Sequence, residues 1–189
     1  MSTLVMVEKD GVACIAAETL TTYGSLKKSA RYLESSEKIF RVGDTYIGSV
    51  GWTVYQTVLR SAFENGLELP AIRNKTELFE FSLKLHKKLK RHYFLKEESD
   101  GDGFESTQMT LFLMNRFGLF GLFSNRSVEQ YRRFSAVGSG EELALGAMYA
   151  AYELDASAED IARLGVEAGA EFDRSSLGPI ALKKLKLEA

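Results

Sequence analysis

The first eighteen residues predict a β-hairpin, and no other stretch constrains the fold as strongly. Residues 3–8 have the two-residue alternation of a strand, and Lys9-Asp10-Gly11 is typical of a tight hairpin turn. Residues 12–17 form a second, more apolar strand. The chain therefore opens with antiparallel pairing, and Ser2 lies at the start of the first strand.

Ser2 is also a candidate catalytic residue because of its position next to the initiator methionine. If Met1 is removed, Ser2 carries a hydroxyl and a free α-amine on one residue. An α-amine titrates near ~7.7–8.0, so it can take a proton from the hydroxyl close to neutral pH. This is the arrangement of an N-terminal nucleophile. Because many proteins begin with Met-Ser, the assignment depends on residues further along the chain.

The length, composition and net charge are those of an ordinary globular protein. Its 189 residues suit a single domain over 1–189, and the formal net charge of −2 gives no reason to expect nucleic acid or an anionic membrane as partner. The single cysteine, Cys14, lies in an apolar strand and is expected to be a buried structural thiol. No secretory signal or membrane-spanning run is present, which predicts a cytoplasmic protein.

The remaining pattern places strands and helices in blocks. Residues 25–37 are interpreted as a polar surface loop that has room for a short helical turn. The predicted strands are 38–42, 45–50, 108–115, 119–123, 128–134 and 180–186, and the predicted helices are 52–64, 75–96, 141–154 and 158–172. Block order favours an α+β fold over a doubly wound parallel sheet. The simplest arrangement is a four-layer αββα sandwich of two antiparallel sheets flanked by helices.

The basic run in the helix over 75–96 raises the question of nucleic-acid binding. No aromatic stacking platform accompanies it, so we interpret it as a solvated helix face and expect no nucleic-acid partner. His86 and His92 are six residues apart, which is not the spacing of a metal pair. The acidic loop 97–103 lacks the ligand positions of a calcium-binding EF-hand. No metal or cofactor is expected.

Four segments, in order, resemble the proteasome β-subunit family, and above all its simpler bacterial members. The segments are STLVMVEKDGVACIAAETLTTYG, EKIFRVGDTYIGSVG, SAVGSGEELALGAMYAAYE and EFDRSSLG. The bacterial members include peptidase rings served by an AAA+ unfoldase. The resemblance covers nearly the whole chain and implies the four-layer fold of the N-terminal-nucleophile (Ntn) hydrolases.

The resemblance implies a role for each matching residue. Ser2 would be the nucleophile, Lys38 would favour its deprotonated hydroxyl by charge, and Glu18 would orient Lys38. The backbone N–H of Gly51 would donate to the oxyanion. The hydrogen-bond network around the amine would consist of Ser139, Asp173 and Ser176. A peptide would bind extended, along the strand edges near residues 19–22 and 48–51.

Three positions depart from the family pattern. Ser2 stands where Thr is usual, Glu18 stands where Asp is usual, and Leu177 interrupts a Ser-Gly step. The leading hypothesis is a peptidase that cleaves peptides or unfolded proteins inside a homo-oligomeric ring or double ring, with a possible AAA+ unfoldase partner. One alternative is a catalytically impaired homologue with an assembly or binding role. Another is an Ntn amidase for small amides.

Overall fold

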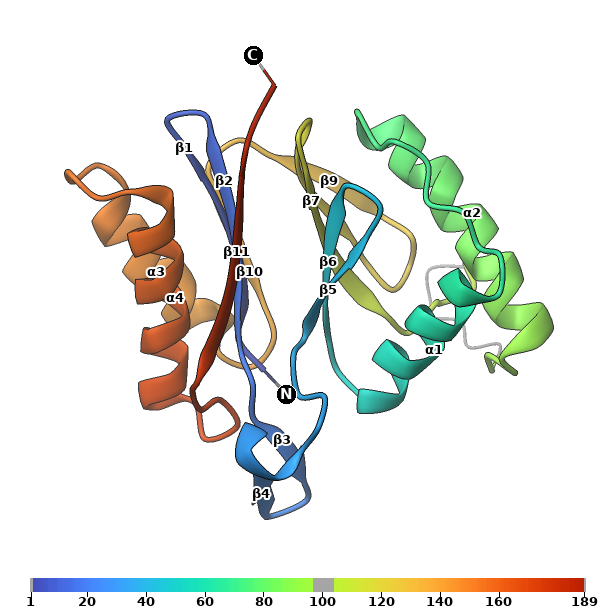
Figure 1. Cartoon of the computed structure of the whole chain (residues 1–189), viewed down its shortest axis with the longest axis horizontal. Coiled ribbons are helices and arrows are strands. Elements are labelled where there is room, and N and C mark those ends of the chain that lie inside the picture. The colour runs from blue at the N-terminus through green and yellow to red at the C-terminus, as the bar shows by residue number, and fades with distance from the viewer. Residues whose placement is uncertain (1, 97–103, 189) are drawn as a thin grey trace.

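Two antiparallel sheets face each other at the centre of the fold, and a pair of helices covers the outer side of each (Figure 1). The computed structural model describes residues 2–96 and 104–188. The first sheet has the order β10 (Phe134–Val137), β1 (Leu4–Lys9), β2 (Val12–Glu18), β11 (Ile180–Lys186). The second has the order β5 (Ile39–Val42), β6 (Thr45–Val50), β7 (Thr110–Asn115), β8 (Gly118–Leu122), β9 (Val128–Tyr131). The predicted α+β four-layer sandwich is confirmed.

The predicted N-terminal hairpin forms the centre of the first sheet. Asp10 and Gly11 have φ of 53° and 72°, the left-handed geometry of a two-residue hairpin turn, and Lys9 pairs with Val12. Both faces of β1 are covered, since Val5 and Val7 face one core cluster while Leu4 and Met6 face another. This burial on two sides explains why the hairpin is so apolar.

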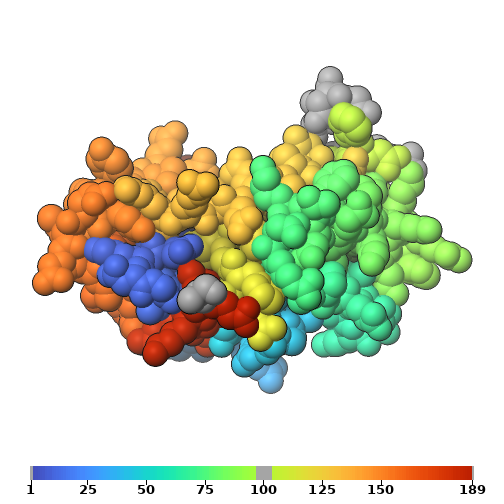
Figure 2. All heavy atoms as spheres, turned by 90° about the horizontal axis from the view of Figure 1, so that it is seen from above, coloured from blue at the N-terminus to red at the C-terminus, as the bar shows by residue number. Residues whose placement is uncertain are grey.

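The helices form the two outer layers. On one side α3 (Glu141–Tyr152) and α4 (Ala158–Phe172) pack over β1 and β2, and on the other α1 (Thr53–Glu64) and α2 (Lys75–His92) cover the second sheet. Figure 2 shows the two helix pairs at opposite sides of the molecule. Ser157 caps α4 through a reciprocal bond with Asp160, as its position before the helix predicts.

The stretch 128–137 differs from expectation. The sequence predicts one strand over 128–134, but the chain makes two. Tyr131 in β9 pairs with Leu119 in the second sheet, whereas Phe134 in β10 pairs with Val7 in the first. The segment therefore crosses from one sheet to the other, which alternation of side chains along a single strand cannot reveal.

Smaller differences concern ends and loops. The loop predicted over 25–37 contains the strand β4 (Leu26–Lys28), which pairs with β3 (Thr21–Tyr23) in a separate two-stranded sheet. The short helical turn considered for this loop is present as a 3-10 turn over Ala30–Tyr32. The second helix ends at His92 instead of continuing to Lys96, because Phe94 adopts a left-handed φ of 55°. The predicted acidic loop over 97–103 lies outside the described residues.

Candidate active site

The predicted site residues lie at strand ends or in the loops beside them, with Lys38 and Gly51 flanking strands of the second sheet and the others flanking strands of the first. Ser2 precedes β1, Glu18 ends β2, and Lys38 precedes β5. Ser139 lies between β10 and α3, whereas Asp173 and Ser176 lie between α4 and β11. Hairpin pairing brings the first two together, since the Glu18 N–H donates to the Thr3 carbonyl at 3.3 Å. The N-terminus lies at this end of the sandwich (Figure 1).

A buried ion pair forms one half of this cluster. The Lys38 ammonium donates to Glu18 Oε1, to the Glu18 carbonyl at 3.1 Å and to the Leu20 carbonyl at 2.8 Å. Glu18 is fully buried, and its carboxylate also accepts the Thr3 N–H at 3.3 Å and the Leu20 N–H at 2.7 Å. Three acceptors account for the three hydrogens of an ammonium, so the orientation of Lys38 is fixed.

Burial and pairing act on Lys38 in opposite directions. Burial lowers the pKa of the Lys38 amine below its ordinary value, while the charge of Glu18 and its hydrogen bond raise that pKa again. The carboxylate therefore keeps a positive charge in a place that would otherwise disfavour it. Lys38 can therefore attract a neighbouring negative charge while its ammonium keeps all three of its hydrogen bonds.

A network of hydroxyls around one carboxylate forms the other half. Ser139 Oγ donates to Asp173 Oδ2 at 2.7 Å, and Ser176 Oγ donates to the same oxygen at 2.8 Å. Ser176 Oγ also lies 2.8 Å from Thr3 Oγ1. The Ser176 N–H donates to the Asp173 carbonyl at 3.1 Å, which fixes the turn.

Glycines let the Ser139 loop approach the N-terminus. Gly138 has φ of 107°, and a Cβ there would lie 2.0 Å from the Ser2 carbonyl oxygen. The Gly140 N–H donates to this same carbonyl at 3.3 Å. Ser2 itself is buried. A side chain at position 138 would push the loop, and Ser139 with it, away from Ser2.

Gly51 lies apart from these contacts but on the same side as Lys38. It follows β6 with φ of 111°, and Ser49, two residues earlier, donates its N–H to the Lys38 carbonyl at 3.1 Å. Strand β6 is an interior strand, so most of the segment 48–51 is already paired with β5 and β7. An extended peptide has access only to its end, beyond Ser49.

The insertion of Leu177 leaves the network intact. Leu177 is about half exposed, while Ser175 and Ser176 stay buried. The departure from the family pattern at this turn is therefore accommodated at the surface.

The sequence alone misses Thr3. Its side chain is buried, its hydroxyl reaches the Asp173 network, and its N–H reaches Glu18. Its position directly after Ser2 is the signal that could have identified it.

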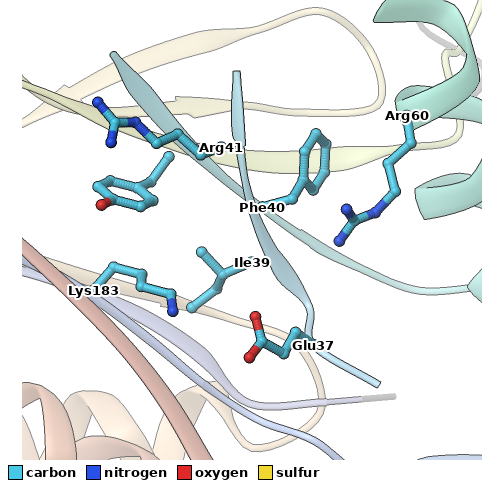
Figure 3. Close-up of a pocket in the computed structure, with 7 residues that line it drawn as sticks. Glu37, Ile39, Phe40, Arg41, Arg60 and Lys183 are labelled. Atoms are coloured by element: carbon cyan, nitrogen blue, oxygen red, sulfur yellow. The ribbon is translucent and has the colours of Figure 1, made fainter. Parts of the chain in front are cut away.

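A separate hollow opens where the edge strands β5 and β11 face each other (Figure 3). It has a volume of about 310 Å³ and is lined by Glu37, Ile39, Phe40, Arg41, Tyr46, Arg60 and Lys183. Figure 3 shows Lys183 and Glu37 pointing into it from opposite sides. Lys38 does not line this hollow, because its ammonium turns to Glu18.

Residues 2–96 and 104–188 contain neither a metal-binding cluster nor a membrane-spanning helix. No group of three or more His, Cys, Asp or Glu residues there could hold a metal ion. Nor is any helix in these ranges long and apolar enough to cross a membrane.

The four-layer fold defines the class of protein, which is the proteasome-like Ntn hydrolases. The search of protein-family profiles and the search of curated proteins each found no match. Among solved structures, BPH of Thiobacillus denitrificans in complex with epoxomicin is 39% identical with a TM-score of 0.93, over 99% of this chain and 100% of that one. BPH without that ligand is 40% identical with a TM-score of 0.92, over 98% of both chains.

HslV from Trypanosoma brucei shares the fold, with a TM-score of 0.73 at 19% identity over 97% of this chain and 99% of that one. At this identity the likeness is one of fold alone. The two BPH structures are much more similar and match over full length. The chain therefore belongs to the proteasome β-subunit family, among the bacterial proteasome homologues, as its motifs predict.

Proposed function

We propose that the chain is a proteasome-like peptidase whose nucleophile is Ser2, exposed as the N-terminal residue by removal of Met1. The observation that carries the proposal is the convergence of two networks on the start of β1. The buried Lys38–Glu18 ion pair binds the backbone of Thr3, and the hydroxyls around Asp173 reach the Thr3 side chain. Ser2 lies one residue earlier in the chain, and its carbonyl accepts the Gly140 N–H.

The reaction is acyl transfer through a covalent ester. The Ser2 α-amine, directly or through a water molecule, takes the proton of the Ser2 hydroxyl, and Oγ attacks the peptide carbonyl carbon. The tetrahedral intermediate collapses as the C–N bond breaks, and the proton passes from the ammonium to the leaving amine. Water, deprotonated by the same amine, then attacks the ester and releases the acid.

Two groups supply the electrostatics of this reaction. Lys38 favours the deprotonated Ser2 hydroxyl by its charge, which its three acceptors hold in place. The N–H of Gly51 donates to the developing oxyanion, where glycine allows a close approach of substrate. The substrate peptide lies extended between residues 19–22 and the end of β6.

The assembly belongs to the same proposal. We expect a homo-oligomeric ring or double ring that encloses the site, in the cytoplasm, acting on peptides or unfolded proteins with a possible AAA+ unfoldase. The family membership supports the ring, and the complex of BPH with epoxomicin supports a peptide-like ligand.

Replacing Ser2 tests the proposal. Ser2→Ala should reduce hydrolysis of a fluorogenic peptide to background, because no hydroxyl remains, while Ser127→Ala, an exposed serine far from β1, keeps full activity. Intact mass measured on both proteins shows whether Met1 has been removed. Undiminished hydrolysis by Ser2→Ala, or Met1 retained in the active protein, would exclude Ser2.

One observation favours a second candidate, a catalytically impaired homologue. Glu18 is longer by one methylene than the usual Asp, and a misplacement of about 1 Å can cost on the order of 100-fold in rate. Normal assembly without any peptide hydrolysis would support this second candidate.

A further inference from the structure

Thr3, the residue after the proposed nucleophile, contacts both halves of the site. Its N–H donates to Glu18 Oε1 at 3.3 Å and its carbonyl accepts from the Glu18 N–H at 3.3 Å. Its hydroxyl lies 2.8 Å from Ser176 Oγ. Thr3 thus connects the Lys38–Glu18 ion pair to the Asp173 network within one residue.

The direction of the hydroxyl contact is set by hydrogen counting. A carboxylate can only accept, so Ser176 gives its single hydroxyl hydrogen to Asp173 Oδ2. Thr3 must therefore donate to Ser176. The chain of donors runs from Thr3 to Ser176 to Asp173. A hydroxyl oxygen has two lone pairs, so Ser176 Oγ has the capacity to accept from one donor besides Thr3.

Two glycines hold the Thr3 side chain in this orientation. A Cβ on Gly140 would lie 2.1 Å from Thr3 Oγ1, and a Cβ on Gly169 would lie 2.3 Å from Oγ1 and 2.6 Å from Cγ2. Thr3 is fully buried in the space that these residues leave. Packing this close restricts rotation of the Thr3 side chain, and leaving its hydrogen-bond partner unsatisfied there is costly.

We propose that Thr3 is a positioning residue, whose hydroxyl fixes Ser176 so that the Ser176 lone pair accepts from the Ser2 α-amine. The inference rests on the proposed function, because it gives that amine its role as base. Thr3 does not touch substrate in this role. Its loss should therefore lower the rate of the chemical step and leave substrate binding unchanged.

The decisive variant is Thr3→Val, which keeps the shape and removes the hydroxyl. With active sites counted by covalent labelling, we expect kcat to fall about tenfold while KM changes less than twofold. Thr3→Ser restores the hydroxyl and should recover kcat to within about threefold. Thr107→Val, which removes another buried hydroxyl that bonds the Ser124 carbonyl at 2.9 Å, is the matched control and should keep the wild-type kcat.

A second measurement works even without peptidase activity. The reaction of the Ser2 α-amine with an acylating reagent, followed against pH by mass spectrometry, gives the titration midpoint of that amine. Thr3→Val should lower the midpoint, since the ammonium loses an ordered acceptor, and Thr3→Ser should restore it. An unchanged midpoint and an unchanged kcat per active site would overturn the role of Thr3.

The two proposals fail in different ways. A wild-type protein that lacks Met1 but shows no hydrolysis or labelling contradicts the proposed function, while the titration of its Ser2 amine still decides the role of Thr3. If Thr3→Val does not fold, Thr3→Ser carries the test. A tenfold loss of kcat in that variant would mean that the methyl group matters instead of the hydroxyl, and would overturn the inference.

Discussion

At the scale of the residue, the longer side chain at position 18 fits its surroundings. The Glu18 carboxylate reaches the Lys38 ammonium, the Thr3 N–H and the Leu20 N–H together. A shorter carboxylate would withdraw from these partners by about the length of one methylene. Ser2 in place of Thr loses only the methyl group that stiffens the rotamer.

The first prediction concerns this position. Glu18→Asp should lower kcat by on the order of 100-fold, because the Lys38 charge is no longer held in place. Steady-state kinetics on a fluorogenic peptide measure the effect, with Glu171→Asp on the exposed side of α4 as the control. A rise in activity would instead show that Glu18 impairs the site, and would favour the impaired homologue.

Cys14 supplies a prediction about stability and pH. The predicted burial is confirmed, and desolvation, reinforced by the charge of Glu159, raises the pKa of the thiol to about 11. An unfolded thiol ionises near ~8.5. Between these values the unfolded chain has lost a proton that the native state keeps, so the free energy of unfolding falls as pH rises.

Cys14→Ala should remove this decline. From about pH 8 to pH 10.5 the wild type should lose about 2 kcal/mol relative to the variant, measured by urea unfolding. Parallel curves for the two proteins would show that the thiol titrates alike in both states.

At the scale of the element, glycines in the two outer helices have opposite roles. In α4, Gly169 packs against Thr3 with no room for a Cβ, whereas in α3 nothing lies within 4 Å of a Cβ on Gly146. Alanine is a better helix former than glycine by roughly 0.5–1 kcal/mol. The packing around each glycine therefore decides whether its replacement by alanine stabilises or destabilises the protein.

Gly169→Ala should destabilise the protein by about 1–3 kcal/mol and lower activity, because the new methyl displaces Thr3. Gly146→Ala should stabilise it by roughly 0.5–1 kcal/mol without affecting activity. Thermal and chemical unfolding test both. Equal stabilisation by the two substitutions would contradict the close packing of α4 on β1.

The elements also show how far the sequence predicts the structure. Hairpin turns and helix caps are local, so Asp10-Gly11 and Ser157 identify their elements correctly. The exchange of sheets between Tyr131 and Phe134 depends on distant partners, Leu119 and Val7, and no local pattern contains it.

The candidate site likewise contains residues that the sequence identifies and one that only the structure identifies. The family resemblance identifies the polar residues that the fold gathers at the N-terminus; their catalytic roles stay predictions. Thr3 is different, because its importance depends on the space beside Gly140 and Gly169, which only the packed structure reveals.

At the scale of the whole molecule, exposed apolar side chains on the outer layer of α3 and α4 favour a contact between copies. The exposed members on the two helices are Leu143, Leu145, Tyr149, Leu164 and Phe172, and Leu154 lies in the loop between the helices. Side chains of this kind gathered on one layer are typical of an interaction surface. The outer layer of α2 is the other candidate for a contact between subunits.

We expect a homo-oligomer in light scattering and a smaller species for Tyr149→Glu, since a charge at a buried contact is costly. Lys87→Glu on the outer side of α2 is the comparison. A monomeric wild type with activity on small amides would favour the amidase alternative over a peptidase ring. An effect confined to Lys87→Glu would place the contact on α2.

The central claim is that Ser2, freed of Met1, is the nucleophile, and one measurement addresses it most directly. The protein is treated with epoxomicin, an epoxyketone that reacts with the hydroxyl and amine of an N-terminal nucleophile, and the labelled peptide is sequenced by mass spectrometry. We predict one adduct per chain, on Ser2, in protein that lacks Met1. An adduct on another residue, or Met1 retained on labelled chains, would contradict the claim.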